Sequence, residues 1–448
     1  MERTSESMTD ATTAMVAGDR GSGHGDLREG QIEVPRGLKG VVVARTEIGD
    51  VRGDEGFYHY RQYSAVDLAR EATVEDVWFL LFEGRLPSVG ERDAFSAAMA
   101  PHREVPAEVA AVLPAIARSA ASPLDGFRTA LSLLAAHLGL RPVIDLDPDE
   151  RKADAARLCA VTPTLLTALH RLRTGEEPVA PQPGLGWAEN YLWMLDGRLP
   201  APEAARAIES YLISTIDHGF NASTFTARVI ASAGADVGAC LVGAIGALSG
   251  PLHGGAPSRA LDLLEEIGPL AGVADGVLHE ADRARIDEVV GAKLRHGEKL
   301  MGFGHAVYQG EDPRSTMLRE VATSLGGPLV DRARLVEGRV IELLDEFRPE
   351  RGLRTNVEYY AGVVMARCGL APEMFTPTFA SSRVIGWSAN VLEQAADGKI
   401  LRPSARYVGP AAPVPVPSRI SPTVASIPVV PPWVAAEPTR SQGKVKIA

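Results

Sequence analysis

The chain has few cysteines, and those few are far apart. Its 448 residues include only three, Cys159, Cys240 and Cys368. Such spacing forms neither a disulfide framework nor the close set of thiols that holds a metal ion. We therefore expect no bound metal and a reducing, cytoplasmic location.

Positive charge is also scarce, because 46 lysines and arginines stand against 57 aspartates and glutamates, for a formal net charge of −11. Nucleic-acid-binding proteins usually present a basic face, so this balance argues against that class.

The first 34 residues include Glu2, Glu6 and Asp10 without an apolar core, unlike a secretory signal or an acid-poor transit peptide. The longest uncharged apolar stretch, Val237–Leu252, is shorter than the roughly 20 residues of a membrane span. We expect it to be a buried helix and the protein to contact no membrane.

Most of the chain has the apolar spacing of amphipathic helices. Apolar residues recur at i, i+3, i+4 and i+7 over residues 74–82, with Thr73 placed as the N-cap and Gly84 as the stop. The same spacing over residues 205–216 ends just before His218. The pattern therefore places His218 at a helix end.

Other local signals give a further helix, a loop and sparse strands. Ser258 is expected to cap a helix that ends at Gly268. Strand propensity is confined to Val41–Val43 and the segment around Phe57-Tyr58, which predicts a short ribbon. Residues 174–183, rich in proline, are expected to form a loop between helices.

Three histidines stand in glycine-rich frames, with arginines and one carboxylate downstream. The frames are Asp217-His218-Gly219, Gly250-Pro-Leu-His253-Gly-Gly255 and Gly302-Phe-Gly-His305. Glycine lets the backbone approach a ligand closely, and the arginine fork matches the two oxygens of a carboxylate. The set fits a small, multiply charged acid and the movement of a proton. Its downstream members are Arg314, Asn356, Glu358, Arg383 and Arg402.

These segments resemble the signature segments of citrate synthases. The resemblance runs in order from about Gly37 to Gly409. It is carried by Gly37-Leu-Lys-Gly-Val41, Tyr60-Arg61, Leu80-Leu-Phe-Glu-Gly-Arg-Leu-Pro87, His218-Gly-Phe-Asn-Ala-Ser-Thr-Phe225, Gly250-Pro-Leu-His-Gly-Gly-Ala256, Met301-Gly-Phe-Gly-His-Ala-Val-Tyr308, Asn356-Val-Glu-Tyr-Tyr360, Ser382-Arg-Val-Ile-Gly-Trp387 and Arg402-Pro403.

The resemblance implies an all-α fold of a large and a small helical domain, with the active site in the cleft between them. It also implies a homodimer in which each site borrows an arginine from the partner. The corresponding division is a disordered extension over 1–34, a large domain over 35–257 and 369–412, a small domain over 258–368, and a disordered proline-rich tail over 413–448.

Citrate synthases take a proton from the methyl group of acetyl-CoA, join the enol to the ketone of oxaloacetate, and hydrolyse citryl-CoA. By resemblance, His253 donates to the thioester oxygen, His305 polarises the ketone and His218 contacts oxaloacetate. Glu358 stands in the position of the base, where the family ordinarily has aspartate. Each role has an alternative. His253 could be a buried structural histidine, and the frame of His305 could be a glycine hinge. His218 could cap a helix, and Glu358 could be an exposed glutamate on a helix.

The remaining candidate residues bind rather than react. By resemblance, Arg314, Arg383 and Arg402 clamp the carboxylates, with Arg402 supplied across the dimer; a surface role is the alternative for each. The resemblance also implies that Phe379 lies near the reacting carbons, and packing in the core is the alternative. The candidate coenzyme contacts are Met301, Gly302, Phe303, Gly304, Arg351 and Asn356.

The sequence therefore predicts a citrate synthase that binds oxaloacetate and acyl-CoA and has no tightly bound cofactor. One alternative is a 2-methylcitrate synthase that uses propionyl-CoA, since one methylene in an apolar pocket is worth only about 1–3 kcal/mol. The other is a non-catalytic paralogue that binds acyl-CoA or a dicarboxylate, for which Glu358 is the best support.

Overall fold

The structure is a computed structural model that describes residues 30–250, 253, 256–305, 307–308, 310–410 and 413, without the side chains of 256–259. Residues 42–402 form one compact unit, and the described residues of 30–41 and 403–413 belong to a second. In the second unit, Arg36–Leu38 is a single 3-10 turn and Arg406 pairs with Glu33 at 3.2 Å. The predicted extension over 1–34 and the tail over 413–448 lie almost wholly outside the described residues.

The unit over 42–402 is helical, which confirms the predicted fold class. Its three strands form one antiparallel sheet in the order β1-β2-β3, with Val51 opposite Tyr58. The strands are β1 Gly49–Arg52, β2 Phe57–Tyr60 and β3 Tyr63–Ser64. The α-helices are α1 Ala65–Glu71, α2 Val74–Glu83, α3 Val89–Met99, α4 Ala107–Ala110, α5 Leu113–Ser119, α6 Pro123–His137, α7 Pro148–Thr174, α8 Trp187–Asp196, α9 Pro202–Thr215, α10 Ala222–Ser232, α11 Val237–Leu248, α12 Ala256–Ile267, α13 Glu280–Arg295, α14 Pro313–Leu325, α15 Pro328–Phe347, α16 Val357–Arg367 and α17 Phe375–Asp397.

Local capping chemistry explains the helix ends that the sequence predicts correctly. Thr73 Oγ1 accepts from the Asp76 amide at 3.2 Å, and the Asp76 carboxylate accepts from the Thr73 amide at 3.0 Å. This capping box starts α2, which ends at Gly84 in the left-handed region. Helix α9 ends at Thr215, so His218 follows a helix end as predicted. The predicted loop over 174–183 also lies between two helices, α7 and α8.

Three predicted boundaries are wrong. Val41–Val43 forms no strand, because the ribbon is made by β1 and β2, which pair with each other; the strand signal at Phe57-Tyr58 is confirmed. Helix α12 begins at Ala256 instead of after Ser258, since Pro257 fits the first turn of a helix; its end at Gly268 is confirmed. Helix α11 stops at Leu248 rather than running to Leu252. The residue before Pro251 is disfavoured in helical geometry, which accounts for the earlier stop.

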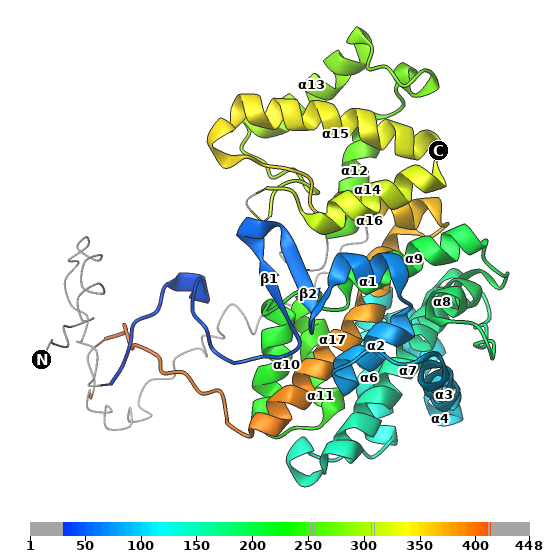
Figure 1. Ribbon diagram of the computed structural model, residues 1–448, viewed down its shortest axis with the longest axis vertical. Coiled ribbons are helices and arrows are strands. Elements are labelled where there is room, and N and C mark those ends of the chain that lie inside the picture. Colours follow the sequence, from blue (N-terminus) through cyan, green and yellow to red (C-terminus); the bar gives the residue numbers. More distant parts are fainter. Residues whose placement is uncertain are drawn as a thin grey trace, which may run out of the picture. The chain divides into compact units, whose positions relative to one another are not determined.

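Helix α17 lies at the centre of this unit. It packs against α7, α9, α10 and α11, and Figure 1 shows it in orange beside α10 and α11. Helices α12 to α16 pack largely on one another, and α9 contacts α14 and α16. The loop that follows α9 therefore lies where these two groups of helices meet. None of the described helices is long and apolar enough to cross a membrane.

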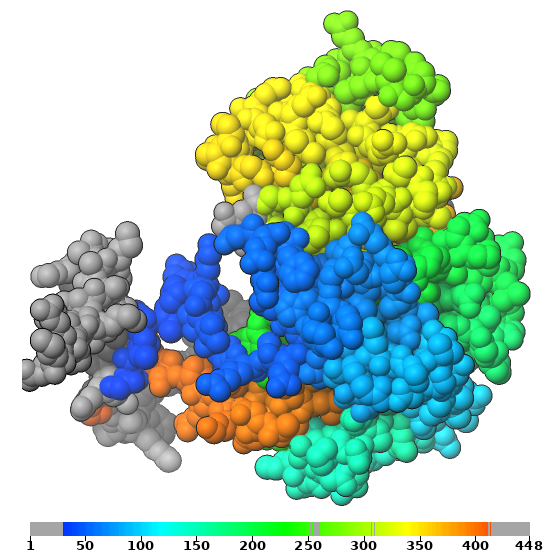
Figure 2. All heavy atoms as spheres, in the orientation of Figure 1, coloured from blue at the N-terminus to red at the C-terminus, as the bar shows by residue number. Residues whose placement is uncertain are grey.

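The β1–β2 hairpin closes against the segment that carries His305. In the space-filling view, its blue atoms meet yellow-green atoms of the segment after residue 300 (Figure 2). The approach is so close that a Cβ added at Gly53 would lie 2.3 Å from the carbonyl oxygen of Val307. The hairpin thus forms one wall of a cavity beside His305.

Candidate active site

A cavity of about 590 Å³ gathers most of the predicted site residues. Its walls come from β1, the loop after α9, the segment after residue 303, and helices α14, α16 and α17. The predicted residues among its lining are His218, His253, Gly304, His305, Arg314, Asn356, Glu358, Phe379 and Arg383. Segments that lie more than a hundred residues apart in sequence thus meet at one place.

The close approach of α17 to the end of α9 positions two of these side chains. A Cβ at Gly386 would lie 2.0 Å from the carbonyl oxygen of Ile216, so only glycine permits this packing. One turn earlier, Arg383 donates from Nε to the Thr215 carbonyl at 2.7 Å. His218, just beyond, has its Nε2 2.9 Å from the Tyr308 hydroxyl. Burial, with nearby Arg314 and Arg383, holds the pKa of His218 well below its usual value.

The His305 ring is held in one tautomer. Its Nδ1 accepts from the backbone amides of Val307 at 2.9 Å and Tyr308 at 3.1 Å. Burial and the adjacent Arg314 lower the pKa of His305 to about 4, so the ring is neutral. Its single proton therefore lies on Nε2, 3.2 Å from Nη2 of Arg314. Two donors side by side make a site for an oxygen acceptor.

Arg314 is fixed by the carboxylate that begins its own helix. Asp312, the N-cap of α14, accepts from Arg314 Nε at 3.0 Å and Nη2 at 2.8 Å. The same carboxylate accepts from the Val357 amide at 3.0 Å, which ties α14 to the start of α16. Burial opposes the charge of Arg314, yet Asp312 raises its pKa overall. Nη1 of Arg314 makes no hydrogen bond to a described residue and remains a donor.

Arg383 is a buried cation without a carboxylate partner among the described residues. Its exposed fraction is 2%, and only Nε donates to the protein. Its guanidinium lies over the Phe379 ring, 4.5 Å from the centroid. Burial lowers the pKa of Arg383. The nearby Asp217 carboxyl opposes this effect but makes no ion pair with the guanidinium. Since a buried charge without an ion pair is costly, an anionic ligand at the free nitrogens of Arg383 would be favoured.

His253 is bound by a hydroxyl with three polar neighbours. Its Nε2 lies 2.8 Å from Ser223 Oγ, which accepts from Trp387 Nε1 at 3.1 Å and donates its proton to Asn221 Oδ1 at 2.7 Å. Because that proton goes to Asn221, Nε2 of the neutral His253 ring donates to Ser223. Turning the hydroxyl proton from Asn221 to His253 would move the ring proton to Nδ1, where it could be donated to a ligand. Burial and Arg383 lower the pKa of His253 to about 4, so this ring too is neutral.

Glu358 occupies the first turn of α16. The N-cap Asn356 accepts from the Glu358 amide at 3.0 Å and donates to the Gly304 carbonyl at 2.8 Å, linking this turn to the His305 segment. Among the described residues, none forms a hydrogen bond or ion pair with the Glu358 carboxylate. Burial raises the pKa of Glu358 to about 7, against the opposing effect of Arg314. A carboxylate with this pKa is suited to general base catalysis near neutral pH.

Five predicted residues lie outside the cavity lining. Phe303 is buried against Tyr359, with ring centroids 5.2 Å apart, so its side chain serves the core. Arg351 and Arg402 are exposed. The other two, Met301 and Gly302, form the turn before Phe303.

Several residues that shape the site were not predicted from the sequence. Asp50 and Val51 of β1 line the cavity, and nothing in their local sequence indicates it. Tyr308, Asp312 and Ser223 orient His218, Arg314 and His253 as described above. Tyr308 and Ser223 lie inside the quoted motifs, and Asp312 lies two residues before Arg314, so the sequence offered a signal for each of them.

Comparison with known proteins identifies the family. A family model described as "Citrate synthase, C-terminal domain" matches residues 37–404. The citrate synthase of Deinococcus radiodurans is 34% identical over 387 residues, covering 84% of this chain and 96% of the relative. The 2-methylcitrate synthase of Mycobacterium tuberculosis is 36% identical over 382 residues, covering 84% of this chain and 91% of the relative.

A solved structure agrees with this assignment. It is the citrate synthase of Thermoplasma acidophilum in a ternary complex with carboxymethyl coenzyme A and oxaloacetate. Its TM-score is 0.77 at 27% sequence identity, and the match covers 86% of this chain and 98% of that one. With the fold, the cavity and the matched residues in agreement, this chain belongs to the citrate synthase family and is an acyltransferase-type enzyme.

Proposed function

We propose that this enzyme condenses acetyl-CoA with oxaloacetate and hydrolyses citryl-CoA to citrate and CoA. The observation that carries the proposal is the pair of arginines in one cavity: Arg383 has no carboxylate partner among the described residues, and Arg314 keeps Nη1 free. Two guanidinium groups fit the two carboxylates of a small dicarboxylate. His305 and His218 are neutral donors or acceptors beside them, suited to the ketone and hydroxyl positions of such a ligand.

In this proposal Glu358 begins the reaction. Its carboxylate takes a proton from the methyl group of the thioester, and the C–H electrons form the carbon–carbon double bond of the enolate. The Ser223 hydroxyl turns from Asn221 to Nε2 of His253, which leaves the ring proton on Nδ1, and His253 then donates a hydrogen bond to the thioester oxygen as charge develops there. A neutral imidazole is sufficient for this role, because it gives a hydrogen bond without having to be ionised.

The enolate carbon then attacks the ketone carbon of oxaloacetate. The ketone oxygen gains negative charge and is stabilised by His305 Nε2–H and the adjacent Arg314 Nη2. It then takes up one proton to become the hydroxyl of citryl-CoA, which balances the proton that Glu358 removed. Water subsequently hydrolyses the thioester bond, releasing CoA as the thiol. Gly304 and Asn356 in the lining, with Met301, Gly302, Phe303 and Arg351 nearby in sequence, are proposed to contact the coenzyme.

The second candidate is condensation of propionyl-CoA, favoured by the 36% identity to a 2-methylcitrate synthase. The 34% identity to a citrate synthase is similar, so overall likeness does not separate the two. The test is thiol release from purified protein with oxaloacetate and either acetyl-CoA or propionyl-CoA. Preference for acetyl-CoA supports the first proposal and preference for propionyl-CoA the second. If neither acyl-CoA gives thiol release, a non-catalytic binding protein would be favoured.

The predicted assembly is part of the proposal. Residues 258–368 are proposed as a small domain that closes on a large domain of 35–257 and 369–412. The exposed position of Arg402, outside its own cavity, is compatible with its donation to a partner's site in a homodimer. A cytoplasmic location is proposed from the three separate free thiols.

A further inference from the structure

The loop Asp217–Asn221 presents His218 and Phe220 to the cavity, and it is held from behind by polar contacts. Asp217 is 3% exposed, and its Oδ2 accepts from the Gly219 amide at 3.0 Å. This contact closes a turn in which Gly219 has φ +62, in the left-handed region. The carboxylate of Asp217 thus fixes the turn that directs the His218 ring forward.

Asn390 of α17 connects Asp217 to a buried arginine. Its Nδ2 donates to Asp217 Oδ1 at 3.2 Å and its Oδ1 accepts from Arg228 Nη1 at 3.1 Å. Because a guanidinium can only donate, Arg228 dictates that the oxygen of the Asn390 amide faces it. The amide nitrogen is thereby directed to Asp217.

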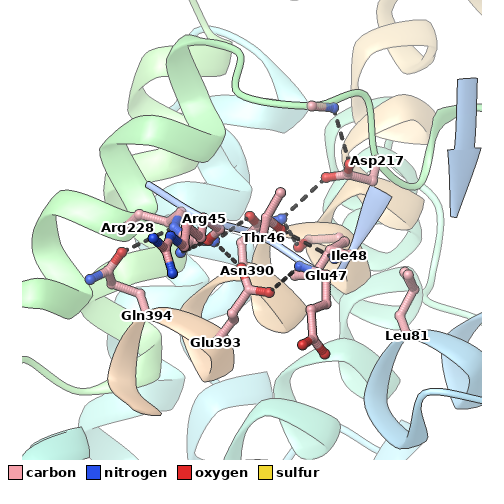
Figure 3. Close-up of polar contacts among 12 residues, drawn as sticks. Arg45, Thr46, Glu47, Ile48, Leu81, Asp217, Arg228, Asn390, Glu393 and Gln394 are labelled. Carbon is pink, nitrogen blue, oxygen red and sulfur yellow. Dashed lines mark hydrogen bonds and ion pairs between the residues drawn. The ribbon is translucent and has the colours of Figure 1, made fainter. Parts of the chain in front are cut away.

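Arg228 of α10 is 1% exposed and has several acceptors (Figure 3). Besides Asn390, it donates from Nε to Gln394 Oε1 at 3.1 Å and from Nη1 to Glu393 Oε2 at 2.5 Å. Nη2 lies 3.4 Å from the Arg45 carbonyl. Its guanidinium also lies 5.3 Å from the centroid of the Phe220 ring, which lines the cavity. One planar group therefore contacts the loop along two routes, through Asn390 to Asp217 and directly at Phe220.

We propose that Arg228 is a positioning residue for the substrate-binding loop Asp217–Asn221. It acts through Asn390 on one side of His218 and through Phe220 on the other. The inference rests on the proposed function, since it takes the cavity as the place where oxaloacetate binds. The planar, forked guanidinium of Arg228 is essential to this role. A lysine ammonium is a point charge and cannot hold Asn390, Glu393 and Gln394 in one plane.

The test separates positioning from ordinary ion-pair stabilisation. The double variant Arg228→Gln/Glu393→Gln removes the fork without leaving the partly buried carboxylate of Glu393 without its ion pair. The matched control is Arg103→Gln/Glu75→Gln, a second pair of low exposure, 3.2 Å apart, whose residues do not line the cavity. Both variants should lose thermal stability. Only the first should raise the KM for oxaloacetate, by about tenfold, with kcat changed less than about threefold, as for a small displacement of a binding group.

The outcome is decided by KM, not by stability. An unchanged KM in the folded Arg228→Gln/Glu393→Gln protein, or an equal rise in the control, would overturn the proposal. If the double variant does not fold, the single variant Arg228→Lys replaces it, because lysine keeps a positive charge opposite Glu393. Arg228→Lys should also raise the KM for oxaloacetate. A KM equal to that of wild type would show that the charge alone positions the loop and would overturn the proposal. Failure of the proposed function is distinct, because the unmodified enzyme would then release no thiol from either acyl-CoA.

Discussion

Replacing Glu358 by glutamine keeps the size of the side chain and removes its ability to accept a proton. General bases contribute about 10²–10⁴-fold to rate, and no other described carboxylate lines the cavity except Asp50 on the opposite β1 wall. We therefore expect Glu358→Gln to lower kcat by about that factor. Oxaloacetate affinity should change little, because the arginines and histidines proposed to bind it are untouched.

The raised pKa also links Glu358 to stability. Between its usual value of 4.5 and about 7, the native carboxyl stays protonated while the unfolded chain ionises. Native stability therefore falls as pH rises through this window, by on the order of 3 kcal/mol in total. Glu358→Gln has no such loss, so relative to wild type it should gain stability between pH 4.5 and pH 8. We therefore expect Glu358→Gln to be less active than wild type but more stable at pH 8, because wild type must ionise a buried carboxyl at that pH.

Two assays examine these expectations. Thiol release with saturating oxaloacetate gives kcat, while calorimetric titration with oxaloacetate gives affinity, each for wild type and Glu358→Gln. Thermal unfolding of both proteins at pH 5 and pH 8 gives the stability comparison. If Glu358→Gln keeps more than about a tenth of wild-type kcat, the assignment of the base is wrong. If its relative stability is the same at both pH values, the carboxyl does not have the raised pKa that its burial implies.

Further predictions concern pH, packing and assembly. As pH rises through about 7, kcat of wild type should increase because Glu358 becomes ionised; a flat profile from pH 5.5 to 8 would contradict this. Gly386→Ala should destabilise the protein by about 1–3 kcal/mol in urea unfolding, since its Cβ would meet the Ile216 carbonyl. Calorimetry should show tighter acetyl-CoA binding with an oxaloacetate-like dicarboxylate present, because the proposed binding residues belong to both predicted domains. Mixing inactive Arg402→Ala and His305→Ala chains should restore some turnover if sites are shared; none after verified subunit exchange would reject sharing.

Local chemistry made part of the fold predictable. The start and end of α2 follow from Thr73, Asp76 and Gly84, which interact within a few residues of one another. The ribbon was harder, because Val41–Val43 has strand propensity but no partner, whereas β1 has a weaker signal and pairs with β2. Strand formation depends on a second segment, so propensity alone selected the wrong residues.

The candidate site divides in a similar way. The glycine frames and arginines indicated which donors to expect, and nine predicted residues line one cavity. Arg228 was not found by the same reasoning, since its importance comes from Asn390, Glu393 and Gln394, more than 160 residues away in sequence. A short motif carries information on the residues that meet a ligand, but the contacts that hold the motif arise only after the helices have packed.

The protonation states of the site residues are the property that the sequence predicts least well. The frame Gly302-Phe303-Gly304-His305 indicates an exposed imidazole but not which nitrogen bears its proton. Two backbone amides that donate to Nδ1 leave the proton on Nε2, and burial together with the nearby Arg314 keeps the ring neutral. The same burial that lowers the pKa of the histidines raises that of Glu358, because it disfavours every charged form. Neutral donors and a base that ionises near pH 7 are therefore consequences of one enclosed site, and a change that opened the cavity to water would shift both together.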